Sequence, residues 1–294
     1  MKADSQSSVE SNMIVESHRW PPSALAYMAR ALLSSPGFRP GEKFPTIAEV
    51  WSGALISSDD IRRFREATGL DETSILFPHA FGFRALMATL TNRMFPLPIW
   101  NALQIRNQLV AYRRLEGGRP YDIGTRTGDQ RIVEKGIEVD LVTRIMQAGR
   151  CDWESIITFF YRGRFGTPSN VPATQPPDLS DAPVISQFRT NVGGGWTFGS
   201  LTGDYNGIHI WPQYARRLGF RAAFLHPQRA AGMCLARLPA LKCQPQKLDL
   251  WIKGPVFYSQ DVNLSAIHTA TEIRFGLALA GDPRFAISGT WKHL

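Results

Sequence analysis

A proline-rich stretch near the middle of the chain constrains its fold more than any other feature. Residues 166–183 (GTPSNVPATQPPDLSDAP) contain five prolines and almost no apolar periodicity, a composition typical of a linker. A linker at this point divides the 294 residues into two halves of ordinary domain size. The sequence therefore predicts an N-terminal arm and short helix at 1–34, a first domain at 35–165, and a second domain at 184–294.

The pattern of apolar residues predicts the same order of elements in both halves. The first half has a strand at 47–56, helices at 61–68 and 81–92, and strands at 103–112, 121–127, 136–148 and 151–163. The second half has a strand at 184–192, a helix at 227–238, and strands at 248–256, 262–270, 271–280 and 284–291. A run of antiparallel strands after helices is typical of an α+β fold, with the helices on one face of a sheet.

The segment before the main helix is longer in the second half. From Gly69 to His79 the first half advances 10 positions, whereas from Gly203 to His226 the second half advances 23. The additional residues include the stretch 200–209 (SLTGDYNGIH). We therefore expect the second half to be the one elaborated for chemistry, through these additional residues. We expect the first half to be plain, in the sense that it lacks such a segment.

This stretch places a carboxylate close to an imidazole. Asp204 and His209 are five positions apart, and a glycine lies on each side of the intervening Asn206. A cluster of Gly, Asp and Asn is often a turn without chemistry. An acid and a base held in one loop are also what proton transfer requires, and a second histidine downstream, His226, favours this interpretation.

The charge of the chain restricts its partners. A net charge of +8 and a pI near 9.7 indicate either an ordinary basic protein or one with an acidic partner. The chain contains no run of five Lys or Arg residues and no nucleic-acid-binding motif, so we expect no nucleic acid partner.

The cysteines and apolar runs restrict the compartment. An odd number of cysteines without a C-x-x-C spacing argues against a disulfide framework and against a zinc site; they are Cys151, Cys234 and Cys243. No signal peptide and no run of about eighteen apolar residues is present. We therefore expect a cytoplasmic protein without a membrane span and without a metal.

Residues 202–209 (TGDYNGIH), followed by Ala215, resemble the signature of the MaoC-like family of (R)-specific enoyl hydratases and 3-hydroxyacyl dehydratases. That signature reads S/T-G-D-x-N-P-I/L-H and is followed by Ala or Ser. The resemblance implies a double hotdog of the α+β class, in which two antiparallel sheets each wrap around a central helix. It also implies that 184–294 is the hotdog with the catalytic loop and that 35–165 is a non-catalytic hotdog.

The resemblance identifies Asp204 and His209 as a catalytic pair that acts through a water. The implied reaction is the reversible dehydration of (R)-3-hydroxyacyl thioesters to trans-2-enoyl thioesters, with the substrate carried on coenzyme A (CoA) or an acyl carrier protein and with no other cofactor. The implied partners are an acyl-CoA or an acyl carrier protein, and a homodimer is left open. The candidate substrate-binding residues are Asn206, Gln228, Phe224 and Phe198, of which the two phenylalanines are also typical core residues.

The sequence departs from the family pattern at two positions. Gly207 replaces the usual proline, which loosens the loop because glycine admits backbone conformations that proline forbids. His226-Pro227 replaces the usual His-Gly, whose glycine supplies an N–H to the thioester oxygen in the family, and proline has no N–H. Either Gln228 or another amide at this helix N-terminus replaces that donor, or activity on ordinary substrates is weak.

Two alternative functions fit the same residues. A degenerate hotdog would bind acyl or polyketide thioesters without dehydrating them, an alternative motivated by Gly207 and Pro227. A hotdog thioesterase would instead release a free thiol. Hydration of an enoyl thioester, binding without turnover, and thiol release distinguish the three functions.

Overall fold

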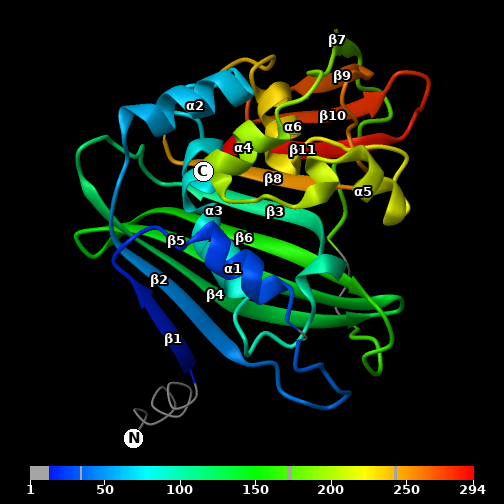
Figure 1. Ribbon diagram of the computed structural model, residues 1–294. Helices are drawn as coiled ribbons and strands as arrows, with labels where there is room; N and C mark the ends of the chain where they lie inside the picture. Colours follow the sequence, from blue (N-terminus) through cyan, green and yellow to red (C-terminus); the bar gives the residue numbers. More distant parts are fainter. Residues whose placement is uncertain (1–12, 34, 171–173, 242–243) are drawn as a thin grey trace, which may run out of the picture.

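A computed structural model describes residues 13–33, 35–170, 174–241 and 244–294. In it, eleven strands form one sheet in the order β1-β2-β4-β5-β6-β3-β8-β11-β10-β9-β7 (Figure 1). The strands are β1 (Met13–His18), β2 (Thr46–Leu55), β3 (Leu103–Ala111), β4 (Pro120–Val133), β5 (Gly136–Gln147), β6 (Arg150–Arg162), β7 (Val184–Arg189), β8 (Gln246–Ile252), β9 (Asp261–His268), β10 (Glu272–Leu279) and β11 (Phe285–His293).

The sheet contains the repeat that the sequence predicts. The order β2-β4-β5-β6-β3 in the first half matches β7-β9-β10-β11-β8 in the second, strand for strand. In chain order, each half has a first strand (β2 or β7), then helices, then a second strand (β3 or β8). Three further strands follow that second strand. The α+β class and the repeated order of elements are thus confirmed.

The two halves join into one sheet, where two separate sheets are predicted. β3 and β8 pair antiparallel at the junction, with Leu109 opposite Leu248 and Asn107 opposite Leu250. This pairing satisfies backbone N–H and C=O groups that an open sheet edge would leave exposed. The prediction misses the junction because the apolar pattern of an edge strand does not say which strand pairs with it.

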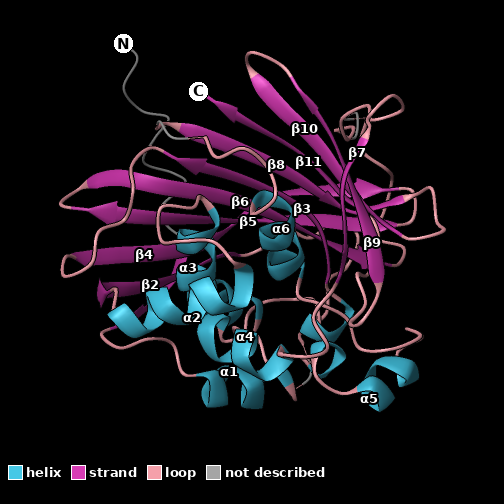
Figure 2. Cartoon of the chain, turned by 90° about the horizontal axis from the view of Figure 1, so that it is seen from above, coloured by secondary structure: helices cyan, strands magenta, loops and turns pink. Residues whose placement is uncertain are grey.

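The helices gather on one face of the sheet, as the α+β pattern predicts (Figure 2). They are α1 (Ala24–Ala31), α2 (Ser58–Thr68), α3 (Leu76–Leu90), α4 (Gly195–Thr202), α5 (Pro212–Arg217) and α6 (Pro227–Leu235), with 3-10 turns η2 (Ile99–Asn101) and η3 (Gly207–His209). The sequence predicts α1, α2, α3 and α6, whereas α4 and α5 are too short to give a clear period.

α3 is the main buried helix of the first half. Every residue except Arg84 is buried, and the helix packs on β2, β4 and β5. It begins at Leu76, earlier than the predicted start at residue 81, because Pro78 falls in the first turn, where its missing N–H breaks no helical hydrogen bond. α6 is the corresponding helix of the second half, with all residues from Gln228 to Leu235 buried.

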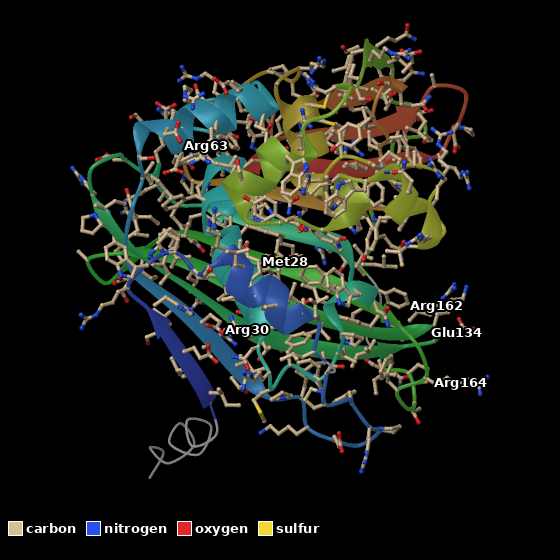
Figure 3. All side chains as sticks on the ribbon, viewed as in Figure 1. Met28, Arg30, Arg63, Glu134, Arg162 and Arg164 are labelled. Atoms are coloured by element: carbon tan, nitrogen blue, oxygen red, sulfur yellow. The ribbon has the colours of Figure 1, made fainter. Side chains whose placement is uncertain are left out.

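Part of the predicted N-terminal arm is a strand. β1 pairs in parallel with β2, and His18 Nε2 lies 2.6 Å from the buried Glu49 Oε2. Asn92 donates to both Glu16 (3.0 Å) and Glu49 (2.9 Å), and Arg30, labelled in Figure 3, donates to Glu16 (3.3 Å). The polar residues that suggest an arm therefore form a contact network, although residues 1–12 lie outside the described part of the chain.

The segment predicted as a linker contains no helix or strand over its described residues, 166–170 and 174–183. It lies against the second half of the sheet, because Trp251 Nε1 donates to the Thr174 carbonyl (3.2 Å) and Leu179 is buried beside Gly276. The proline-rich composition thus marks a connection that packs on the second half of the sheet.

Cys151 and Cys234 are free thiols, and burial raises the pKa of the Cys234 thiol to about 12. Cys243 lies outside the described residues. No helix in the described ranges is both long and apolar enough to cross a membrane. The cytoplasmic location stays a prediction.

Candidate active site

The loop with Asp204 and His209 is built by turns that its own side chains stabilise. α4 ends at Gly203, whose φ of 80° is in the left-handed region that favours glycine. The Asp204 carboxylate then accepts from the Asn206 N–H (3.1 Å), and the Asn206 side-chain oxygen accepts from the Ile208 N–H (3.2 Å). Two successive Asx turns therefore shape the loop, and Asn206 caps η3.

His209 faces the Asp204 carboxylate. Its Nδ1 lies 2.9 Å from the Phe224 carbonyl oxygen, which can only accept a hydrogen bond, so we assign the proton of the neutral ring to Nδ1. Nε2 is then unprotonated and lies 4.0 Å from Asp204 Oδ2. The side chains of His209 and Asp204 are only 5% and 14% exposed.

His226 packs against this pair. It is the N-cap residue of α6, and its Nε2 donates to the Asp204 carbonyl oxygen at 3.0 Å. Its ring stacks on that of His209 with 3.9 Å between centroids. Its Nδ1 is buried and has no partner among the described residues. His226 therefore supports both members of the pair.

Burial determines the charge of both imidazoles. It lowers the pKa of His209, and the negative charge of Asp204 opposes this shift. Burial and the neighbouring His209 lower the pKa of His226 further below its ordinary value. Both rings are therefore neutral near pH 7, so His209 can act as a base.

Four residues distant in sequence hold this loop, and the sequence prediction misses all of them. The Tyr27 hydroxyl of α1 donates to the Gly203 carbonyl, and the Tyr258 hydroxyl donates to the His209 carbonyl (2.9 Å). Arg84 of α3 donates to the Ser200 carbonyl (2.9 Å), and Arg63 of α2, labelled in Figure 3, donates to the Ser200 hydroxyl (3.5 Å). No local motif contains these residues, so only the folded chain reveals them.

The structure brings the predicted substrate-binding residues to the same region. The Phe224 ring packs edge-on against His209, with centroids 4.9 Å apart, and the fully buried Phe198 packs on His226 at 4.9 Å. The side-chain oxygen of Asn206 is already used within the loop, where it accepts from the Ile208 N–H. Gln228 is buried in the first turn of α6, and its side-chain oxygen has no partner among the described residues. Their contact with a substrate stays a prediction.

Pro227 is the first residue of α6, as the sequence predicts. The first α6 amide with a backbone acceptor is that of Arg229, which donates to the His226 carbonyl at 3.0 Å. The Gln228 N–H comes before it and has no backbone acceptor among the described residues. This N–H is one of the first-turn amides that have no acceptor within the helix.

Asp204, His209 and His226 also meet the spacing of a metal-binding group, with one potential ligand atom each, all within 4.8 Å of one another. His226 Nε2 already donates to a carbonyl oxygen, so it carries a proton that a metal would have to displace. The chemistry of these donors therefore fits a proton-transfer site better than a metal centre, and the absence of a metal stays a prediction.

The sequence is similar to that of a known dehydratase. No protein-family model matches it. It is 25% identical over 191 residues to 3-hydroxyacyl-thioester dehydratase X of Mycobacterium tuberculosis, and the alignment covers 63% of this chain and 67% of that protein.

Solved structures share the fold. HtdX of Mycobacterium tuberculosis matches with a TM-score of 0.70 at 19% identity, over 84% of this chain and 100% of that one. A MaoC-like dehydratase from Phytophthora capsici matches with 0.64 at 15% identity, over 86% and 96%. A conserved hypothetical protein of Mycobacterium tuberculosis with a double hotdog fold matches with 0.57 at 13% identity, over 83% and 95%. The predicted resemblance to MaoC-like dehydratases is thus confirmed.

Proposed function

We propose that this protein is a hydro-lyase that dehydrates (R)-3-hydroxyacyl thioesters to trans-2-enoyl thioesters and catalyses the reverse hydration. The observation that carries this proposal is the separation of 4.0 Å between His209 Nε2 and Asp204 Oδ2. An unprotonated nitrogen and a carboxylate at this distance can both hydrogen-bond one water. The similarity to a 3-hydroxyacyl-thioester dehydratase supports the same reaction.

The pair supplies the two proton transfers of the reaction. In dehydration His209 Nε2 takes the Cα proton, and this proton passes across the gap to the Asp204 carboxylate. Asp204 then gives it to the departing β-hydroxyl, so the C–O bond breaks, water leaves and both groups return to their starting state. Hydration is the reverse, with the bound water as the source of the hydroxyl. No other cofactor takes part in this scheme.

The thioester oxygen needs a hydrogen-bond donor as enolate charge develops on it. Pro227 cannot supply one, and we assign this role to the open N–H of Gln228 at the N-terminus of α6. Asn206 shapes the loop, and the ring of Phe224 borders the reacting atoms beside His209. Phe198 supports the site from behind His226.

We further propose that each half of the sheet is a hotdog that curves around its own helix, α3 in the first and α6 in the second. Residues 184–294 form the catalytic hotdog, and 35–165 form the plain one, which borders the groove for the acyl chain. The substrate is carried on CoA or on an acyl carrier protein. The net charge of +8 favours the acidic carrier protein.

The test is a hydration assay on enoyl thioesters of graded chain length, each prepared on CoA and on acyl carrier protein. The wild-type chain is expected to consume the conjugated enoyl thioester. Asp204→Asn and His209→Ala should each lower the rate by at least about a thousandfold, because each removes one of the two proton-transfer groups. The matched controls are Asp129→Asn and His268→Ala, which change exposed side chains far from this loop in sequence.

Each outcome separates the alternatives. A nearly full rate in both catalytic variants contradicts the assignment of the pair. Binding without turnover at every chain length indicates a degenerate hotdog, and release of free thiol indicates a thioesterase.

A further inference from the structure

Arg229, in the first turn of α6, is a buried cation without an anionic partner. Its side chain is 5% exposed. Nε donates to the Ala67 carbonyl (3.2 Å), Nη1 donates to the Gly193 carbonyl (2.7 Å), and the Tyr258 hydroxyl interacts electrostatically with the guanidinium. All three partners are neutral, and none of the ion pairs between described residues includes Arg229.

The backbone around this guanidinium leaves room for it. Gly194 has φ 101°, and a Cβ at this position would lie 2.8 Å from Arg229 Nη1 and 2.9 Å from Nη2. Any larger residue at 194 would therefore displace the guanidinium. Ala67 is in the last turn of α2, whose carbonyl end carries partial negative charge and balances the cation only in part.

The partners of Arg229 belong to the segments that hold the candidate catalytic pair. Gly193 directly precedes the N-cap of α4, and the other end of α4 leads into Asp204. Tyr258 donates its hydroxyl to the His209 carbonyl at 2.9 Å. The Arg229 side chain therefore connects the segment that leads into Asp204 with the residue that holds His209.

A buried charge without a counter-ion is unfavourable, and burial lowers the pKa of Arg229. A methionine would fill similar space without this cost. The charge is useful if negative charge develops nearby during the reaction. Removal of the Cα proton places such charge on the thioester oxygen, and the N-terminus of α6 lacks one donor at Pro227.

We infer that Arg229 is a positioning residue for the dehydration. It fixes the segments that carry Asp204 and His209, and its unbalanced charge stabilises the enolate-like transition state at the N-terminus of α6. The charge thereby compensates for the N–H that Pro227 does not provide. This inference rests on the proposed function.

Kinetics of charge-retaining and neutral variants test this role. Arg229→Met should lower kcat by about tenfold to a hundredfold, with KM changed less than about threefold, because the charge acts mainly on the transition state. Arg229→Lys should recover most of kcat. The control is Arg237→Met, because Arg237 donates to Met233 and lies over Phe188, away from the pair. An unchanged kcat in Arg229→Met overturns the inference, and equal losses in the Lys and Met variants overturn the role of charge.

Gly194→Ala is a second variant that displaces the guanidinium but keeps its charge in the chain. It should lower kcat, and an unchanged kcat overturns the positioning role even if Arg229→Met fails to fold.

A spectroscopic test separates this inference from the proposed function. Acetoacetyl-CoA absorbs differently as its enolate, and it should show a larger enolate fraction on Asp204→Asn than on Asp204→Asn combined with Arg229→Met or Gly194→Ala. If the wild type hydrates no enoyl thioester but this difference is present, the proposed function fails and the role of the charge stands. If hydration occurs but no enolate forms, or its fraction is the same in all variants, the inference fails alone.

Discussion

The two halves have the same strand order, yet they place an acid and a base differently. In the first half His18 of β1 pairs with the buried Glu49 of β2, whereas in the second half His209 faces Asp204 in the loop ahead of the main helix. Each half has a buried histidine early in its main helix or at its start, His79 in α3 and His226 at the N-cap of α6. His79 packs on Phe83 and Trp153, and its Nε2 has no partner among the described residues. His226 instead holds the Asp204 carbonyl. A buried histidine near the start of the main helix thus serves packing in one half and the candidate site in the other.

The difference lies in what precedes the helix. α3 has 15 residues and is buried almost throughout, so the first half has little chain left for a loop. α6 has 9 residues, and the segment before it forms α4, η3 and α5. The repeated scaffold supplies the rigid frame, and one elaborated connection supplies the chemistry.

The largest difference in activity between the halves is expected when one glycine in each half is replaced by alanine. Gly195→Ala would place a Cβ 2.1 Å from the His209 carbonyl oxygen, so the loop must move. A shift of this size should lower kcat/KM by at least about a hundredfold. In Gly82→Ala the Cβ would lie 3.4 Å from Ile123 Cγ2, an ordinary contact, and α3 should gain up to about 1 kcal/mol. Hydration kinetics and urea unfolding check both, and similar activity losses would contradict the contrast.

The next contrast replaces the two histidines by the same residue. His226→Leu leaves the Asp204 carbonyl without its donor and should lower kcat/KM by about tenfold or more. His79→Leu removes a buried nitrogen that has no partner, so activity should stay within about twofold and the free energy of unfolding should rise by about 1 kcal/mol. A loss of activity in His79→Leu equal to that in His226→Leu would show that the first half also takes part in the chemistry.

The stability of the first half should depend on pH through His79. Burial lowers its pKa to about 3, so between pH 3 and about 6.5 the unfolded chain binds more protons than the folded chain. The free energy of unfolding therefore falls as the pH falls, by about 1.4 kcal/mol per pH unit for this residue. From pH 7 to pH 5 the wild type should lose about 2 kcal/mol more than His79→Leu. Urea unfolding at both pH values checks this, and parallel losses would contradict it.

Much of the fold follows from the sequence, because the strands and main helices have clear periods and stops. α2 ends at residue 68 as predicted, but it begins at Ser58 rather than at residue 61, because Ser57 and Asp60 form a capping box ahead of it. The pairing of β3 with β8 and the contacts of β1 are not predictable in this way, because they depend on which distant strand is near.

The same division applies to the site. Asp204 and His209 share a short motif with family-like spacing, His226 follows 17 positions after His209, and the structure brings all three together. Tyr27 and Tyr258 hold that loop from distant parts of the chain, and no spacing along the chain connects them to it. Arg229 follows His226 by three positions, but its contact with Gly193 ahead of α4 is visible only in the folded chain.

The smallest expected effect on kcat is that of Pro227→Gly. This variant tests how the second half compensates for the N–H that Pro227 does not provide. Pro227→Gly restores an N–H at the first position of α6, where proline itself is favourable. If the charge of Arg229 already stabilises the thioester oxygen, this N–H should change kcat less than about threefold in the wild type. In the Arg229→Met background the same change should raise kcat by about tenfold, because the oxygen then lacks that stabilisation.

The ratio of the two effects is measured by a double-mutant cycle on enoyl thioester hydration. Equal effects in both backgrounds would mean that the buried guanidinium and the missing amide act independently, and that the second half compensates for Pro227 by other means, such as the Gln228 N–H.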